Sequence, residues 1–177
     1  MMAARELIVE RGWSSASNRA IADRAGVNLA LINYHFGGKR GLLAAVLDQA
    51  AVEIAVGYGP PPDAQGNVAE FVAAAVRSVT RLKEDPNARV LAVATLEATY
   101  DPEIAAGVTR SLVDLRHRIQ AVLEKRAPAG ASAGLTILLA ALMDGILFHC
   151  LLDPNTDVEA AAAAALSIGW TNPSSAA

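Results

Sequence analysis

The amino-acid sequence predicts an all-helical protein. Its 177 residues are 53% hydrophobic and 19% charged, which is enough apolar content for a buried core and argues against disorder. Aromatic residues make up only 5%, so alanine, leucine and valine supply most of the apolar side chains, as in closely packed helices. Apolar residues recur every three or four positions, and no segment of useful length alternates as a β-strand does.

The predicted elements are nine helices, at about residues 3–11, 18–25, 29–34, 39–54, 68–82, 86–99, 102–123, 132–152 and 158–165. Local signals mark the ends of the first three. Gly12, Gly26 and the pair at 37–38 follow them, and glycine is the residue that most readily ends a helix. Ser17 and Asn28 are suitable N-caps for the second and third helices.

The fourth helix is long and ends at the glycine- and proline-rich stretch 57–62, which no helix can cross. Pro86 and Pro102 stand at the start of the sixth and seventh helices, where proline is tolerated. Asp153 and Pro154 end the eighth helix, and Asp157 can cap the ninth. Beyond the loop the sequence pattern is therefore helical throughout.

Charge is distributed unevenly along the chain. Residues 1–45 hold six Lys/Arg against three acids, which gives 6 − 3 = +3, so the remaining residues carry −6 of the total of −3. A basic segment on an acidic body suggests that only the segment meets a polyanion. Chance fluctuation explains the charge difference equally well when it is taken alone.

The cellular compartment of the protein is inferred from weaker signals in the sequence. Cys150 is the single cysteine, so no internal disulfide is possible, which fits a reducing cytoplasm. No signal peptide is visible at the amino end. The longest apolar run, at 135–143, is interpreted as a buried helix and not a membrane span, because it is short and Asp144 and His149 interrupt its continuation.

Residues 17–36 (SNRAIADRAGVNLALINYHF) predict a helix-turn-helix. Gly26 can adopt the positive φ that the turn needs, and Ala22 is small where the two helices cross. Ile21, Val27 and Ile32 are spaced to pack the pair. An ordinary helical hairpin is the alternative, since alanine, glycine and valine are common in this chain.

The segment that follows favours DNA binding over a plain hairpin. Residues 34–38 are polar and aromatic, and Lys39 opens the next helix. A cation at a helix N-terminus opposes the helix dipole, but a bound phosphate reverses that cost. The combination predicts a contact with the DNA backbone.

Several motifs together resemble the TetR (tetracycline-repressor) family of bacterial regulators. They are Ala25-Gly26-Val27, Asn33-Tyr34-His35-Phe36, Gly38-Lys39 and Leu42, and the resemblance covers about residues 4–48. A weaker likeness to a family helix covers 142–146 and 151–154. The resemblance implies a three-helix DNA-binding head and a helical ligand-binding, dimerising body. It also implies a homodimer formed through the last two long helices. We place the boundary inside the fourth helix, between 1–45 and 46–177, because the charge balance changes sign near Val46.

The resemblance also implies which residues contact DNA. Phosphates are expected to bind at the start of the second helix, through Ser17 and Arg19. Base edges are expected to be contacted by Asn28, Leu29, Ala30 and Asn33. The DNA backbone is expected to be held by Tyr34, His35 and Lys39. Asn28 and Asn33 are the only amides for adenine-type readout, and the apolar residues suit thymine methyl groups. Specificity is therefore expected to rely partly on DNA shape. Family members usually carry a basic arm before the first helix, so either the natural start lies upstream or these contacts are lacking.

The body offers candidates for lining an effector pocket, each of which also fits a core or surface role. They are Phe71, Glu97, Tyr100, Arg110, His117, Met143 and Phe148. His35, His117 and His149 lack the spacing of metal ligands, so no metal and no other cofactor are expected. No set of nucleophile, base and carboxylate is apparent, so we do not expect an enzyme.

The resemblance implies a ligand-responsive transcriptional regulator in the bacterial cytoplasm. It is expected to be a repressor that a small apolar or amphipathic effector releases from a pseudo-palindromic operator, with the unbroken helix at 39–54 linking head to body. The alternative is a helical small-molecule-binding or dimerising adaptor without specific DNA binding.

Overall fold

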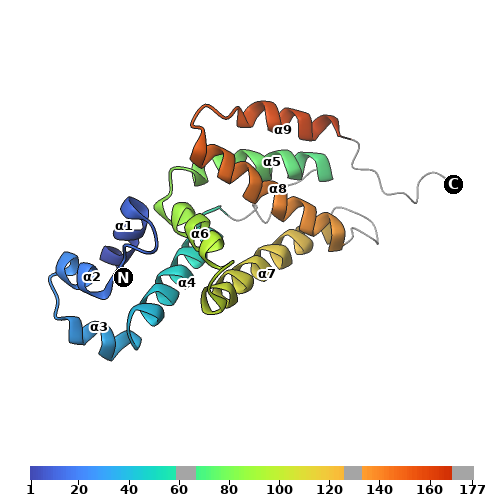
Figure 1. Ribbon diagram of the computed structural model, residues 1–177. Helices are drawn as coiled ribbons and strands as arrows, with labels where there is room; N and C mark the ends of the chain where they lie inside the picture. Colours follow the sequence, from blue (N-terminus) through green and yellow to red (C-terminus); the bar gives the residue numbers. More distant parts are fainter. Residues whose placement is uncertain (59–66, 126–132, 169–177) are drawn as a thin grey trace. The chain divides into compact units, whose positions relative to one another are not determined.

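The computed structural model describes residues 1–58, 67–125 and 133–168, and it is helical throughout these ranges (Figure 1). The helices are α1 (Met2–Arg11), α2 (Asn18–Ala25), α3 (Leu29–Phe36), α4 (Lys39–Tyr58), α5 (Val68–Leu82), α6 (Pro86–Glu97), α7 (Pro102–Glu124), α8 (Ala133–Leu152) and α9 (Val158–Ser167). The all-helical fold and each predicted helix are confirmed. Residues 59–62 of the predicted loop and residue 132 lie outside the described ranges.

The chain forms two compact units. The first contains residues 1–57 and 85–111, and so includes α1 to α4, α6 and the start of α7. The second is built from the described parts of 58–84 and 112–177, which hold α5, the rest of α7, α8 and α9. Helix α6 therefore packs with the predicted head. The functional division at residue 45 stays a prediction.

The core of the first unit lies where α1, α4 and α6 meet. Ile8 of α1, Leu42 and Leu47 of α4, and Val90 of α6 are each at most 1% exposed. Burying a large aliphatic side chain contributes about 1.5–3 kcal/mol. The long helix α4 is thus held along much of its length by the first unit itself.

In the second unit α5 packs against α9 and α8. Val72, Val76 and Val79 of α5 are at most 1% exposed, and Ala162 of α9 is fully buried. The Arg77 Nε atom of α5 also lies 3.0 Å from the Glu159 Oε2 atom of α9. Small side chains on α9 allow a close approach of the two helices.

Helix α8 is less buried than its sequence predicted. It has 20 residues with a mean hydropathy of 2.1, so by length and composition alone it would also qualify as a membrane span. Only 28% of its most apolar window is buried in the chain, and Ile137 and Leu138 are each more than half exposed. The prediction of a buried helix is therefore wrong for much of α8 within this chain, because apolar composition does not show which side of a helix its neighbours cover.

Candidate DNA-binding site

Two side-chain caps and a left-handed glycine build the predicted helix-turn-helix. The Ser17 Oγ atom accepts a hydrogen bond from the Ala20 backbone N–H at 3.1 Å, and the Asn28 Oδ1 atom accepts one from the Ala30 N–H at 2.8 Å. Between the helices Gly26 adopts φ 65°, a left-handed conformation that costs glycine little. The turn therefore has the local chemistry that its sequence indicates.

Packing between α2 and α3 relies on fewer residues than predicted. Ile21, Ala22 and Ile32 are each at most 4% exposed, as the predicted packing requires. Val27 is the correction, because it keeps 42% of its surface exposed. Val27 lies in the turn between the two helices, directly before the α3 cap Asn28, and not on a buried helix face.

Helix α3 presents nearly all of its surface. Ile32 is its one buried residue, while Leu29 is 42%, Leu31 46% and Tyr34 83% exposed. Ala30, Asn33 and His35 are exposed as well. A helix with one anchoring residue and exposed apolar side chains is suited to a partner that the chain itself does not supply.

The connection from α3 to α4 is tight. Gly37 and Gly38 have φ values of 69° and 108°, and a Cβ on Gly41 would collide with the Phe36 backbone carbonyl. The start of α4 therefore sits directly against the end of α3. The Lys39 Nζ atom donates to the Ser14 carbonyl at 3.4 Å, which ties the predicted phosphate-binding lysine to the loop before α2.

One arginine pairs with two of the three acids of the head. Arg24 of α2 donates bidentate hydrogen bonds to the Glu10 carboxylate of α1, at 3.0 and 2.8 Å, and one hydrogen bond to Glu6 at 3.3 Å. The hydrogen bond from Arg24 holds the pKa of Glu10 below its ordinary value. These pairs fix α2 on α1 and leave Asp23 as the other acid of residues 1–45.

The cations of the head separate into two groups. Arg5 and Arg40 pair with Glu53 and Glu103, at 3.1 and 3.4 Å, in addition to the Arg24 contacts. Across the described ranges, Arg19 and Lys39 form no ion pair, and Arg11 forms none either, although its charge also helps to lower the pKa of Glu10. Arg19 and Lys39 are two of the residues predicted to contact the DNA backbone, and they remain available to phosphates.

Family comparisons agree with this geometry. The sequence profile of the bacterial regulatory proteins of the tetR family matches residues 1–46, and that of the tetracyclin repressor-like C-terminal domain matches residues 63–168. The chain belongs to the TetR family. It is accordingly a DNA-binding transcriptional regulator, and the resemblance inferred from its motifs is confirmed.

Solved structures of other transcriptional regulators have a similar fold. A transcriptional regulator from Rhodococcus sp. Rha1 is 24% identical, with a TM-score of 0.75 over 93% of this chain and 88% of that one. A protein described as a transcriptional regulator from Streptomyces coelicolor A3(2) is 26% identical, with a TM-score of 0.75 over 94% and 92%. FadR from Bacillus subtilis, solved with stearoyl-CoA, is 20% identical, with a TM-score of 0.69 over 94% and 93%. No curated protein matches in a sequence search.

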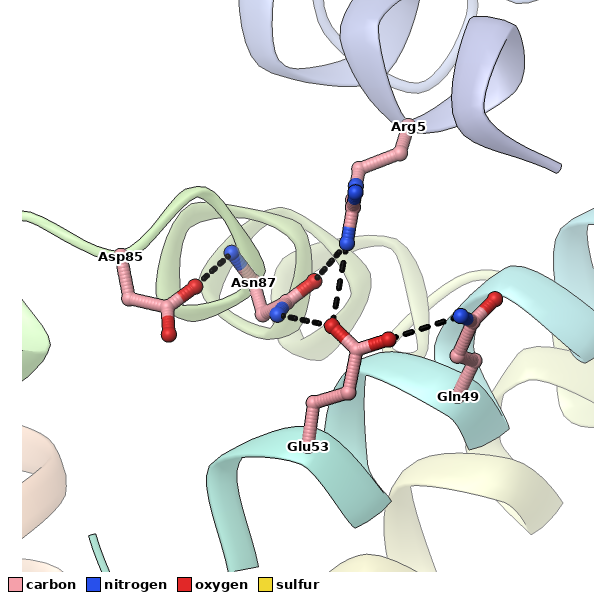
Figure 2. Close-up of polar contacts among 5 residues, drawn as sticks. All are labelled: Arg5, Gln49, Glu53, Asp85 and Asn87. Carbon is pink, nitrogen blue, oxygen red and sulfur yellow. Dashed lines mark hydrogen bonds and ion pairs between the residues drawn. The ribbon is translucent and has the colours of Figure 1, made fainter. Parts of the chain in front are cut away.

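Sequence reasoning missed a polar junction in this TetR chain, formed by Arg5 of α1, Gln49 and Glu53 of α4, and Asn87 of α6 (Figure 2). We call it the α1–α4–α6 junction. The Arg5 Nη1 atom lies 3.1 Å from both Glu53 Oε2 and Asn87 Oδ1, and Asn87 Nδ2 donates to Glu53 Oε2 at 2.7 Å. Gln49 donates to the other Glu53 oxygen at 2.7 Å. Hydrogen bonds from Asn87 and Gln49 lower the pKa of Glu53.

Asn87 is the buried residue of the junction, and the cap of α6 holds its position. It is 4% exposed, and its backbone N–H is bound by the Asp85 side chain at 2.8 Å, in the cap of α6 (Figure 2). A buried amide is stable only when its polar atoms are bonded, as they are here. The sequence offered one signal for Asn87, because it follows Asp85 and Pro86 at the capped start of α6. Its partners Arg5 and Glu53 are too distant along the chain for a sequence pattern to identify them.

The candidate effector residues do not gather in one unit. Glu97, Tyr100 and Arg110 belong to the first unit, whereas the candidates in the second unit are Phe71, His117, Met143 and Phe148. Tyr100 is 89% exposed, and exposed Arg110 pairs with Asp48 at 3.1 Å. These two are corrected to surface residues, because residue type alone had suggested them and it does not reveal exposure.

A small cavity of about 240 Å³ lies beside the α1–α4–α6 junction. Its lining residues are Met1, Met2, Arg5, Val46, Gln49, Ala50 and Asn87. None of the predicted effector residues is among them. Within the described ranges no group of three or more His, Cys, Asp or Glu residues could hold a metal ion.

Proposed function

We propose that this TetR-family regulator is a ligand-responsive repressor that binds a pseudo-palindromic operator as a homodimer in the cytoplasm. DNA would be held at phosphates by Ser17 and Arg19, at base edges by Asn28, Leu29, Ala30 and Asn33, and at the backbone by Tyr34, His35 and Lys39. The observation that carries the proposal is the exposure of α3 between helices that offer unpaired cations. The functional head would comprise residues 1–45 and the body 46–177.

Helices α8 and α9 are proposed to form the dimer interface. On α8 the exposed residues are apolar or small for most of its length, and Leu166 of α9 is 45% exposed. Burial of such a face by a second copy would gain about 25 cal/mol for each Å² of apolar surface. A two-fold dimer presents two recognition helices about 34–36 Å apart, which matches one turn of DNA.

The effector is proposed to be small and apolar or amphipathic. Phe71, Met143 and Phe148 of the second unit are buried or half-buried, which suits such a ligand. FadR from Bacillus subtilis, with the same fold, was solved with stearoyl-CoA, which is amphipathic. An effector that binds one head separation more tightly than the other would shift the dimer away from the operator.

The α1–α4–α6 junction supports a rigid link between the head and α6. Arg5 bonds to residues of both α4 and α6, so α1 cannot move independently without breaking these contacts. Helix α4 also continues unbroken from Lys39 to Tyr58. A change in α6 would therefore reach α1 through bonded side chains and not through a flexible linker.

Selection of bound DNA from a random pool tests the proposal. The full chain should enrich a pseudo-palindrome, and Tyr34→Ala and Lys39→Ala should weaken binding without altering the sequence preferred. Affinity should fall steeply with salt, and Lys39→Ala should reduce the log–log salt slope by about 1. If the chain enriches no DNA sequence and its binding to DNA does not depend on salt, the result would support a dimerising adaptor and overturn the proposal.

A further inference from the structure

The two amides on the DNA-reading surface have their oxygen atoms engaged within the protein. Asn28 Oδ1 accepts from the Ala30 backbone N–H at 2.8 Å, and Asn33 Oδ1 accepts from Asn18 Nδ2 at 3.4 Å. In the described ranges neither amide nitrogen has a hydrogen-bond partner. Each oxygen is thus directed toward the protein, and the NH₂ groups are the parts of the two amides that have no protein partner among the described residues and can reach a base edge.

The orientation of Asn28 follows from its role as the cap of α3. A backbone N–H can only donate, so the amide must present its oxygen to Ala30. Turning the amide over would place an NH₂ group against that N–H and leave the first turn of α3 uncapped. The Asn28 NH₂ group is consequently the part available to DNA.

One neighbour orients the Asn33 amide. Asn18, the first residue of α2, donates to the Asn33 oxygen at 3.4 Å, and this oxygen lies close to Gly38 in the turn after α3. The Asn33 oxygen thus lies against α2 and the glycine turn, although the residue as a whole is exposed. The Asn18 Oδ1 atom is buried without a partner, so the bond to Asn33 is the one that holds the Asn18 amide.

Donor-only amides restrict which bases can be read. Recognition of adenine by two hydrogen bonds needs an amide oxygen to accept from N6 and an amide nitrogen to donate to N7. Guanine O6 and N7 and thymine O4 are acceptors, whereas cytosine presents only the N4 donor in the major groove. An amide that presents only its NH₂ group therefore matches guanine or thymine and is mismatched to cytosine. It can also donate to adenine N7, but the adjacent N6 donor is then left without an acceptor.

We propose that α3 reads its operator through amide hydrogens, with Asn18 as the positioning residue that sets the polarity of Asn33. This inference rests on the proposed function. The base contacted by Asn33 is guanine or thymine, and cytosine is excluded there. Adenine is not selected by the two-bond contact that an unconstrained asparagine makes. The exposed Leu29 and Leu31 add apolar contact that suits the thymine methyl group.

Substitution Asn18→Asp tests the polarity directly. A carboxylate accepts but cannot donate, so the Asn33 amide would turn to donate to it and would present its oxygen to DNA. Selection from a random pool with the full chain should then show, at one position in each half-site, a shift from guanine or thymine to adenine or cytosine. The expected change in preference is about fivefold or more.

Arg19→Ala is the matched control. It changes the net charge by the same amount at the adjacent residue and leaves both amides in place. Binding should weaken for every sequence, with the base preference unchanged. Asn33→Ala is the second variant and should remove discrimination at the same position in each half-site. Thermal unfolding of each variant confirms that it is folded.

The outcomes separate the inference from the proposed function. The inference is supported if Asn18→Asp shifts the base preference at the position where Asn33→Ala loses discrimination, and if Arg19→Ala leaves that preference unchanged. A wild-type preference for adenine or cytosine at that position overturns it, and so does Asn33→Ala with unaltered preference. An unchanged preference in folded Asn18→Asp also overturns it. If the wild-type chain enriches no sequence, the proposed function itself fails.

Discussion

Helices α3 and α8 both leave apolar side chains uncovered, but their chemical surroundings differ. On α3 the exposed Leu29 and Leu31 stand among amide, phenol and imidazole groups, and the flanking helices carry Arg19 and Lys39. On α8 the exposed Ile137 accompanies small and aliphatic residues, and the helix has one acidic residue and no Lys or Arg.

The difference indicates which partner each helix requires. Apolar groups beside unpaired cations suit a polyanion whose base edges carry methyl groups. A nearly uncharged apolar face gains most from a second apolar face. Exposure alone therefore does not identify a partner, and the charged groups nearby decide between nucleic acid and protein.

The largest effect is expected for Leu138→Glu on α8. If α8 is the dimer face, a carboxylate there would be buried without a partner, at a cost of about 3–5 kcal/mol. Sedimentation velocity should show a monomer, and operator affinity should fall with it. Leu96→Glu is the control, because Leu96 of α6 is similarly exposed, at 62% against 55% for Leu138. A persistent Leu138→Glu dimer would place the interface elsewhere.

Gly41→Ala is the next largest change and tests how α3 is presented. Its Cβ would meet the Phe36 carbonyl, so the α3–α4 turn must open, at a cost of about 1–3 kcal/mol. Gly57→Ala in the same helix meets nothing within 4 Å and should stabilise the chain by up to about 1 kcal/mol. Urea unfolding gives the stability of each variant, and a DNA-binding assay gives its affinity for the operator. Equal behaviour of the two variants would contradict the tight turn.

Asn87→Ala tests the α1–α4–α6 junction through its pH dependence. Loss of a buried, bonded amide should cost about 1–2 kcal/mol at pH 7. The pKa of Glu53 is lowered in the folded chain, so its contribution is present above the unfolded value of about 4.3 and is lost as pH falls through the folded value. The difference in free energy of unfolding between wild type and variant should shrink in acid. A difference independent of pH would mean that Asn87 acts by packing alone.

Asp144→Asn on α8 should give the smallest effect, a stabilisation. Burial raises the pKa of Asp144, and the attraction of Arg116 only partly opposes it. A raised folded pKa means that stability falls as pH rises from the unfolded value toward the folded one. The amide removes this cost, so Tm should rise at pH 7 and match the wild type near pH 3. A lower Tm at pH 7 would reveal a stabilising partner of the carboxylate.

Helix boundaries could be predicted because their causes are local. Ser17, Asn28 and Asp157 each bond to a backbone N–H two or three residues ahead, which is a distance that a sequence pattern can capture. The junction could not be predicted in this way. Arg5 is separated by 48 residues from Glu53 and by 82 from Asn87, so no periodicity connects them.

The site was predicted in part for the same reason. The spacing of Ile21, Ala22 and Ile32 identified the buried side of the helix pair, whereas Val27 lies at its margin, where periodicity does not specify depth. The role of Asn28 as a cap was foreseen as an alternative, but the contact of Asn18 with Asn33 joins two helices and requires the fold. Tyr100 shows that residue type is a poor guide to exposure.

The cluster of Arg24 with Glu6 and Glu10 has a kinetic consequence. One arginine and two carboxylates leave a net charge of −1, against −2 for the two acids alone, so Arg24 halves the repulsion that these acids exert on an approaching duplex. The other five cations and Asp23 of residues 1–45 bring the segment to +3. We therefore expect Arg24 to affect how rapidly an operator is found, although its cluster stands outside the surface that reads the bases.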